Sequence, residues 1–153
     1  MRQQGQFATR SISTALAGCC LLGLPATAQM PTRAPLPANV AQVSLIAQDE
    51  SDCTNTTVKD DPNRTRGGEI TVTRQDGGTT TVQVGMTATP NTTYHVFLKC
   101  VRQLGDIKTD EEGSGIGTFS FPTGSVGSTF AFDMYPEGAP HGNKFQSLTV
   151  TIK

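Results

Sequence analysis

Imidazole groups are the first candidates for chemistry, because histidine changes its charge near neutral pH. The sequence of 153 residues has two histidines, His95 and His141. Neither belongs to a recognisable Ser-His-Asp or Cys-His arrangement, and two histidines far apart in the sequence do not supply a structural zinc site. We therefore predict no catalytic residue, no metal ligand and no cofactor, and we interpret both histidines as solvated side chains.

Acidic side chains gather in two places, which raises the question of calcium binding. Asp110, Glu111 and Glu112 precede Gly113 in a polar turn. The denser group consists of Asp49, Glu50, Asp52, Asp60 and Asp61. A calcium loop needs oxygen ligands at alternating positions, whereas the carboxylates of the turn are consecutive. We therefore expect solvated acidic side chains at both places.

The segment 135–143 is the strongest candidate for a binding surface. It reads Tyr-Pro-Glu-Gly-Ala-Pro-His-Gly-Asn and brings an aromatic ring, a carboxylate and an imidazole into one loop. Loops on a rigid scaffold carry function more often than the scaffold itself. We predict that Tyr135, Glu137, His141 and Asn143 contact a ligand or partner. The competing interpretation is a rigid loop that binds nothing.

Short strands are expected to position these residues, because 16 glycines and 9 prolines interrupt the chain too often for long helices. The clearest pattern is a hairpin in which Ile70 and Val72 alternate with threonines before the turn Asp76-Gly77-Gly78. A second alternating run, 81–86, follows that turn. The other strand candidates are 43–47, 53–59, 93–104, 117–121, 130–134 and 148–152.

The segment 93–104 is the longest of these candidates. Its apolar face carries Tyr94, Val96, Leu98 and Cys100, and its polar face includes His95 and Lys99. Successive side chains of a strand point to opposite faces. We therefore expect Cys100 to lie in a buried disulfide and Lys99 to face solvent.

Cys53 and Cys100 are the two cysteines that follow the first 28 residues. An even number of cysteines in an exported chain favours a disulfide, and no further Cys or His stands at metal-ligand spacing. Closing a loop of this length stabilises a fold by about 4 kcal/mol in the chain-entropy model. We predict a Cys53–Cys100 disulfide, with free thiols as the alternative.

Residues 1–28 have the pattern of a secretory signal peptide. Arg2 and Arg10 precede a weakly apolar run, 12–24, and Ala26-Thr27-Ala28 supplies the small residues that signal peptidase reads. We predict cleavage before Gln29, a proline-rich linker at 29–42 and one domain at 43–153. The protein is then periplasmic or extracellular.

A lipid anchor is the alternative to plain cleavage. Leu16-Ala17-Gly18-Cys19 resembles a bacterial lipobox, in which Cys19 would carry the lipid. The apolar run before Cys19 is short, and apolar residues also follow it, so plain cleavage is favoured. Asn55, Asn63 and Asn91 stand in glycosylation acceptor triplets, but the leader looks bacterial, so we interpret them as turn-forming residues.

Period-two alternation along the chain predicts an all-β fold, an antiparallel β-sandwich of about 7–8 strands, with a small closed barrel as the alternative. Pro90-Asn91-Thr92-Thr93-Tyr94-His95-Val96 resembles the corner of fibronectin type III and related immunoglobulin-like sandwiches. In those sandwiches the tyrosine hydroxyl ties back to the chain. The segment 109–115 with its flanking strands is similar to hairpins of bacterial exported immunoglobulin-like domains. The resemblance implies an immunoglobulin-like sandwich and transfers no binding site.

The composition excludes further classes of function. Lys and Arg total 12 against 13 Asp and Glu, which gives a net charge of −1 and no basic surface for nucleic acid. No glycine-rich phosphate loop follows a strand. We predict an exported, non-enzymatic binding or structural module at the cell envelope, with a protein or glycan partner and with membrane contact only if it is lipid-anchored. A small extracytoplasmic enzyme or enzyme-associated domain that uses loop 135–143 is the alternative.

Overall fold

A computed structural model describes residues 34–49, 53, 58 and 60–152, and these form antiparallel strands joined by turns. The strands are β1 (Val40–Ala47), β2 (Arg66–Arg74), β3 (Thr79–Thr87), β4 (Thr93–Leu98), β5 (Arg102–Lys108), β6 (Ser114–Pro122), β7 (Thr129–Phe130), β8 (Phe132–Tyr135), β9 (Phe145–Ser147) and β10 (Val150–Thr151). A single turn of 3₁₀ helix, η1 (Thr123–Ser125), accompanies them in the described residues. The predicted all-β antiparallel fold is confirmed.

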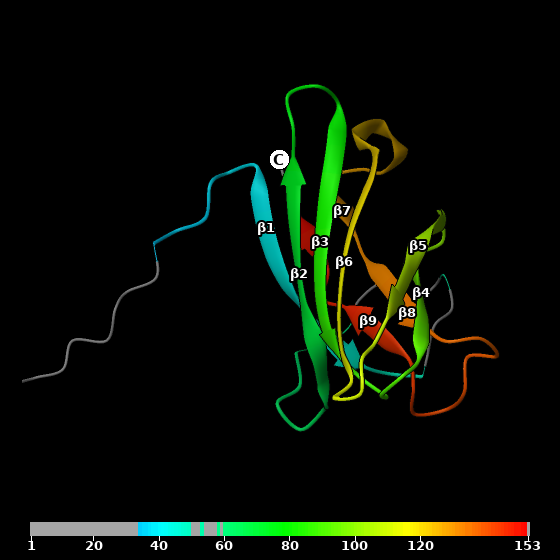
Figure 1. The fold of residues 1–153 in the computed structure, drawn as a ribbon. Coiled ribbons are helices and arrows are strands. Elements are labelled where there is room, and N and C mark those ends of the chain that lie inside the picture. The colour runs from blue at the N-terminus through cyan, green and yellow to red at the C-terminus, as the bar shows by residue number, and fades with distance from the viewer. Residues whose placement is uncertain (1–33, 50–52, 54–57, 59, 153) are drawn as a thin grey trace, which may run out of the picture. The chain divides into compact units, whose positions relative to one another are not determined.

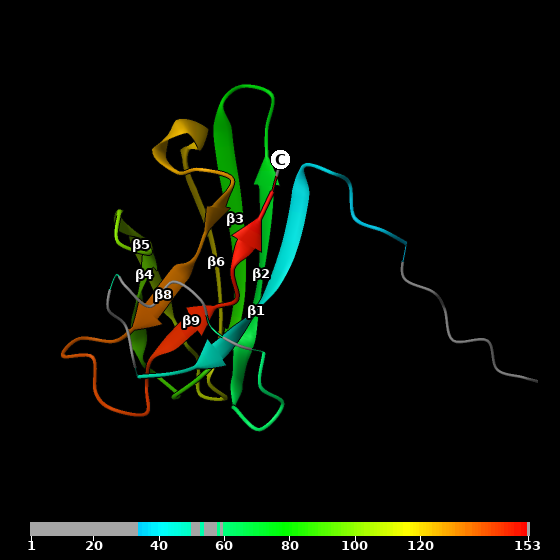
Figure 2. The ribbon, with the colours of Figure 1, turned by 180° about the vertical axis from the view of Figure 1, so that it is seen from behind.

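Eight strands form one continuous sheet in the order β5-β4-β8-β9-β1-β2-β3-β6, and β7 pairs with β10 in a small second sheet. The large sheet folds over on itself, so that β1, β2, β3 and β6 face β5, β4, β8 and β9, as Figures 1 and 2 show from opposite sides. β1 joins the two halves, because Leu45–Ala47 pair with β9 after a register shift beyond Leu45. The fold is a sandwich that approaches a barrel.

The core lies between the two halves of the sheet and consists of their inward-facing side chains. Its buried members are Leu45, Ile70, Val72, Val82, Val84, Met86, Tyr94, Val96, Leu98, Ile107, Phe121, Phe132, Met134, Phe145, Val150 and Ile152. Strand alternation explains most of the set, since one face of most strands is removed from water and the other is not. β8 and β9 are exceptions, because consecutive residues of both strands are buried.

The two ends of the sheet, β5 and β6, meet through side chains. Ile107 of β5 lies directly over Gly115 and Gly117 of β6, where an added Cβ would come within 2.7 Å of it. The ring of Phe119 on β6 similarly covers Gly105 of β5. Because these glycines carry no side chain, the apolar groups of one end fill the space above the other, and we call this contact the β5–β6 seam.

Gly67 gives a steric test of the packing where β2 meets the core. A Cβ added there would lie 2.1 Å from Cδ1 of the buried Phe145 ring, whereas a Cβ added to Gly85 would meet nothing within 4 Å. We expect Gly67→Ala to lower the free energy of unfolding by about 2 kcal/mol, the usual cost of overpacking a core. Gly85→Ala is the matched control and should leave stability nearly unchanged. Urea unfolding measures both, and equal effects of the two substitutions would contradict this packing.

The predicted hairpin is confirmed, with Ile70 opposite Val84 and Val72 opposite Val82. Other boundaries differ from expectation. β1 begins at Val40 rather than Val43, Ala131 separates β7 from β8, and β9 was not expected. Of the candidate 53–59, Cys53 lies in a turn, and residues 54–57 and 59 lie outside the described residues.

The segment 93–104 is a hairpin, and the prediction of one long strand was wrong. β4 ends at Leu98 and β5 begins at Arg102, and Cys100 has a positive φ of 60° in the turn between them. A residue with that backbone conformation reverses the chain, so period-two alternation does not continue through Lys99 and Cys100.

The disulfide between Cys53 and Cys100 is confirmed, with their Cα atoms 5.6 Å apart. The expectation that it is buried was wrong, because both cysteines are exposed. Cys100 belongs to the β4–β5 turn and not to the apolar face of a strand, so the disulfide lies at the surface.

Several sequence features fall partly or wholly outside the described residues. They are the signal peptide 1–28, with Cys19, the first part of the predicted linker (29–33), the acidic residues Glu50 and Asp52, and the acceptor Asn55. Within the described part of the chain, no helix is long and apolar enough to cross a membrane. Asn63 and Asn91 are both turn residues, since Asn63 bonds to the Asp61 carboxylate and Asn91 has a φ of 52°.

Candidate functional site

The outer face of β4, β5 and β8 carries a group of aromatic and polar side chains. We call this group the β4–β8 face; it consists of His95, Phe97, Gln103, Asp106, Tyr135 and Glu137. Strand register assembles it, because His95 lies opposite both Asp106 of β5 and Tyr135 of β8. The alternate residues of β4, Tyr94, Val96 and Leu98, point into the core.

Phe97 and Tyr135 form the apolar centre of this face. Their rings are stacked, with centroids 4.9 Å apart and planes inclined by 13°. Both side chains are only half-buried, so part of each ring remains accessible. Burial raises the pKa of the Tyr135 hydroxyl, and the nearby Asp133 carboxylate raises that pKa further. The pair offers a rigid aromatic surface with a neutral hydroxyl at one end.

His95 lies between two carboxylates, and the expectation that it is freely solvated was wrong. Its Nδ1 is 2.7 Å from Oδ1 of Asp106, and its Nε2 is 3.4 Å from Oε2 of Glu137. Gln103 donates a hydrogen bond of 2.7 Å to the same Asp106 oxygen. The hydrogen bond with Asp106 raises the pKa of His95 above 6.5, although burial opposes the change. The protonated imidazole can donate to both carboxylates at once.

The two carboxylates are expected to affect the pKa of His95 unequally. Because Asp106 is the largest cause of the raised pKa, Asp106→Asn should lower that pKa more than Glu137→Gln does. A group whose pKa is raised by folding stabilises the folded state fully below its unfolded value of 6.5, and this contribution disappears as the pH rises through the raised pKa. NMR titration of the His95 ring protons measures the pKa in each variant. A larger effect of Glu137→Gln would contradict the geometry.

A hollow of about 270 Å³ adjoins the aromatic pair. Its lining includes Phe97, Tyr135, Arg102 and Gln103, together with the Cys53–Cys100 disulfide. A second hollow of about 370 Å³ shares the disulfide and Val101 with the first and is otherwise lined mainly by residues of 125–131. The exposed disulfide therefore forms part of the wall of both hollows.

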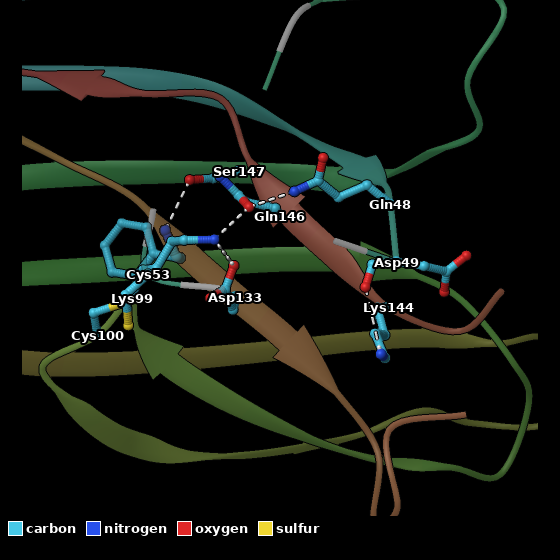
Figure 3. A network of polar contacts seen from close by, with 10 residues as sticks. Gln48, Asp49, Cys53, Lys99, Cys100, Asp133, Lys144, Gln146 and Ser147 are labelled. Atoms are coloured by element: carbon cyan, nitrogen blue, oxygen red, sulfur yellow. Dashed lines mark hydrogen bonds and ion pairs between the residues drawn. A yellow bond between two sulfur atoms is a disulfide. The ribbon is translucent and has the colours of Figure 1, made fainter. Parts of the chain in front are cut away.

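Lys99 is buried beside this face, and the prediction that it faces solvent was wrong. Its side chain is only 3% exposed, and that of Asp133 is 8% exposed. Nζ of Lys99 lies 2.6 Å from Oε1 of Gln146 and 3.4 Å from Oδ1 of Asp133, and Gln48 donates to the same Gln146 oxygen (Figure 3). Burial raises the pKa of Asp133, and the positive charge of Lys99 opposes that change.

Asn143 anchors the loop. The buried Tyr94 hydroxyl accepts a hydrogen bond of 3.2 Å from the Thr89 backbone N–H and also contacts Oδ1 of Asn143. The Thr89 hydroxyl bonds to the same Asn143 oxygen at 3.0 Å. The tie between a tyrosine hydroxyl and the preceding chain, which the resemblance implies, is therefore present. Asn143 extends this tie to the 135–143 loop, which gives it a structural role.

His141 lies apart from the β4–β8 face. Its Nδ1 is 2.9 Å from Oδ2 of Asp49, and the Gly142 N–H donates a hydrogen bond of 2.7 Å to the other oxygen of that carboxylate. The His141 side chain is 91% exposed and adjoins a separate hollow of about 510 Å³. His95 and His141 thus pair with different carboxylates, and Asp49 attaches the loop to the end of β1.

The structure therefore brings together two of the four predicted loop residues, Tyr135 and Glu137, and separates them from His141 and Asn143. It adds His95, Phe97, Gln103 and Asp106, which the sequence pattern did not single out as a site. Among the described residues, no group of three His, Cys, Asp or Glu side chains is placed to hold a metal ion. In comparisons with known proteins, no family model and no curated protein matches the chain.

Proposed function

We propose that the chain is an exported, non-enzymatic β-sandwich of the immunoglobulin-like type that binds a partner at the cell envelope through the β4–β8 face. The stacked, half-exposed Phe97–Tyr135 pair beside its hollow is the observation that carries this proposal. Aromatic side chains supply large contact areas at low entropic cost, which is why they are enriched in binding surfaces.

Export is supported by the leader pattern and by the disulfide. Disulfides persist in oxidising compartments and are rare in the cytosol. Plain cleavage before Gln29 gives a periplasmic or extracellular protein, and modification of Cys19 would give a lipid-anchored one. The intact mass of the exported protein distinguishes the two forms.

Binding to isolated cell-envelope fragments tests the function. The purified exported protein should cosediment with the fragments in a saturable manner, and Phe97→Ala and Tyr135→Ala should each weaken this binding at least tenfold. His141→Ala is the matched control, since it alters the same loop away from the β4–β8 face. The proposal fails if the two aromatic variants cosediment as well as the unaltered protein does.

A small enzyme that uses the same loop is the second candidate. The observation in its favour is the contact between Glu137 and the His95 imidazole, which places an ionisable pair at the surface. Screening the exported protein against ester and glycoside substrates tests this candidate. The enzyme candidate requires that the protein hydrolyses one of these substrates and that His95→Gln abolishes the hydrolysis.

A further inference from the structure

The β4–β8 face combines an aromatic centre with polar groups of one particular kind. Asp106 and Glu137 each use one carboxylate oxygen to contact His95. The contact with His95 orients each carboxylate and so also its second oxygen. That oxygen can accept a hydrogen bond, because an ionised carboxylate is an acceptor only. Gln103 adds an amide that both donates and accepts. A ligand matched to this set brings many hydroxyl donors and an apolar face for the rings.

The hollow beside the rings limits the size of what enters it. Its volume of about 270 Å³ accommodates a group the size of a sugar ring. The core of a protein–protein interface is depleted in charged residues and needs a much larger area. Here Asp106 and Glu137 do not line the hollow but contact His95, which lies opposite Tyr135, and their side chains are 50% and 96% exposed. The size of the hollow and the exposed carboxylates therefore favour a small, hydroxyl-rich ligand over the surface of a partner protein.

The charges of the β4–β8 face and of the hollow beside it nearly cancel. Asp106 and Glu137 are negative, Arg102 at the hollow is positive, and His95 is positive when protonated. Asp133, which also lines the hollow, is paired with the buried Lys99. An anionic ligand would meet the two exposed carboxylates, and a cationic one would meet Arg102, so a neutral ligand fits best.

We propose that the ligand of the β4–β8 face is a neutral glycan. One sugar ring lies against the Phe97–Tyr135 pair, and its hydroxyl groups donate to the free oxygens of Asp106 and Glu137. The charge-assisted O–H···O⁻ bonds give orientation, and the aromatic contact gives affinity. This inference rests on the function proposed above, because it names the ligand of the same surface.

NMR titration of the ¹⁵N-labelled exported protein tests the proposal. The probes are cellotetraose, maltotetraose and chitotetraose, which are neutral, and polygalacturonate, which is anionic. We expect at least one neutral probe to give saturable shifts at His95, Phe97, Gln103 and Tyr135. Phe97→Ala should weaken that binding at least tenfold, Glu137→Gln should weaken it without disturbing the core, and His141→Ala should leave it unchanged.

Three outcomes of the titration would overturn the proposal. They are saturable shifts with none of the neutral probes, tighter binding of polygalacturonate, and shifts confined to residues outside the β4–β8 face. The envelope experiment separates these from failure of the proposed function. If protease treatment of the fragments abolishes cosedimentation and glycosidase treatment does not, the partner is a protein, and the binding function stands while the glycan does not.

Discussion

Lys99→Met lowers the free energy of unfolding by about 3 kcal/mol, which is the expected result of leaving one member of a buried ion pair uncompensated. Lys99 and Asp133 are both almost fully buried, and Lys99 also donates to Gln146. Methionine retains much of the lysine volume, so the loss is expected to come from the charge and not from a cavity. Urea unfolding at neutral pH measures the effect.

Asp133→Asn provides the matched test of that interpretation. In the Asp133→Asn background, Lys99→Met should cost clearly less than it does alone, because no buried carboxylate is then left without its partner. Equal costs in both backgrounds would show that Lys99 stabilises the fold without Asp133, through its packing and its hydrogen bond to Gln146.

Acidification should reduce the difference between the Lys99→Met variant and the unaltered protein. Burial raises the pKa of Asp133 above 3.8, so the folded state binds its proton more readily than the unfolded chain does. The contribution of Asp133 to the free energy of unfolding therefore falls as the pH rises from 3.8 through the raised pKa. Removing Lys99 raises the pKa of Asp133 further. The Lys99→Met variant therefore loses the most free energy of unfolding near neutral pH and the least below pH 3.8.

Loss of the disulfide gives the second large effect. Cys53 and Cys100 are 47 residues apart, and a cross-link over a loop of that length stabilises by about 4 kcal/mol, chiefly by restricting the unfolded chain. We expect the double substitution Cys53→Ser with Cys100→Ser to lower the free energy of unfolding by nearly this amount. Both cysteines are exposed, so the serines leave no buried cavity to complicate the comparison.

Reduction of the unaltered protein serves as the control for that experiment. The reduced protein and the double-serine variant should unfold at the same urea concentration, since both lack only the cross-link. A loss below about 1 kcal/mol would show that the unfolded chain is restricted by other means or that the cross-link strains the folded state.

Residue patterns predicted the parts of the fold that depend on local alternation. The β2–β3 hairpin follows from Ile70 and Val72, from the turn at 76–78 and from the second alternating run. The disulfide followed from the cysteine count, and the Tyr94 tie followed from the resemblance of 90–96 to a known corner. Each of these rests on residues close in sequence or on an unambiguous choice of partner.

The β4–β5 turn could not be predicted in the same way. Lys99, Cys100 and Val101 include no glycine, proline or asparagine, which are the residues that usually indicate a turn. Without that turn, Lys99 falls on the polar face of a continuous strand and Cys100 on the apolar one. The partners that bury Lys99 are distant in sequence, since Asp133 and Gln146 follow it by 34 and 47 residues.

The candidate site was predicted only in part for the same reason. Tyr135 and Glu137 were identified from the composition of their loop, whereas the sequence pattern did not single out Phe97 and favoured a solvated side chain for His95. The pairing of His95 with Asp106 depends on the register of a hairpin whose turn was missed. A correctly placed turn at 99–101 would have brought Gln103 opposite Phe97, but Asp106 comes opposite His95 only through the register shift between Val96 and Phe97.

The β5–β6 seam has a consequence for the motions of the molecule. β5 and β6 stand at the two ends of the strand order. At the seam, Ile107 of β5 covers glycines of β6, and Phe119 of β6 covers Gly105 of β5. Apolar contact lacks the directionality of a hydrogen-bonded ladder, so thermal fluctuations should part this junction before any other in the large sheet. Deuterium would then enter the backbone amides along β6 sooner than those of the central β1 and β2.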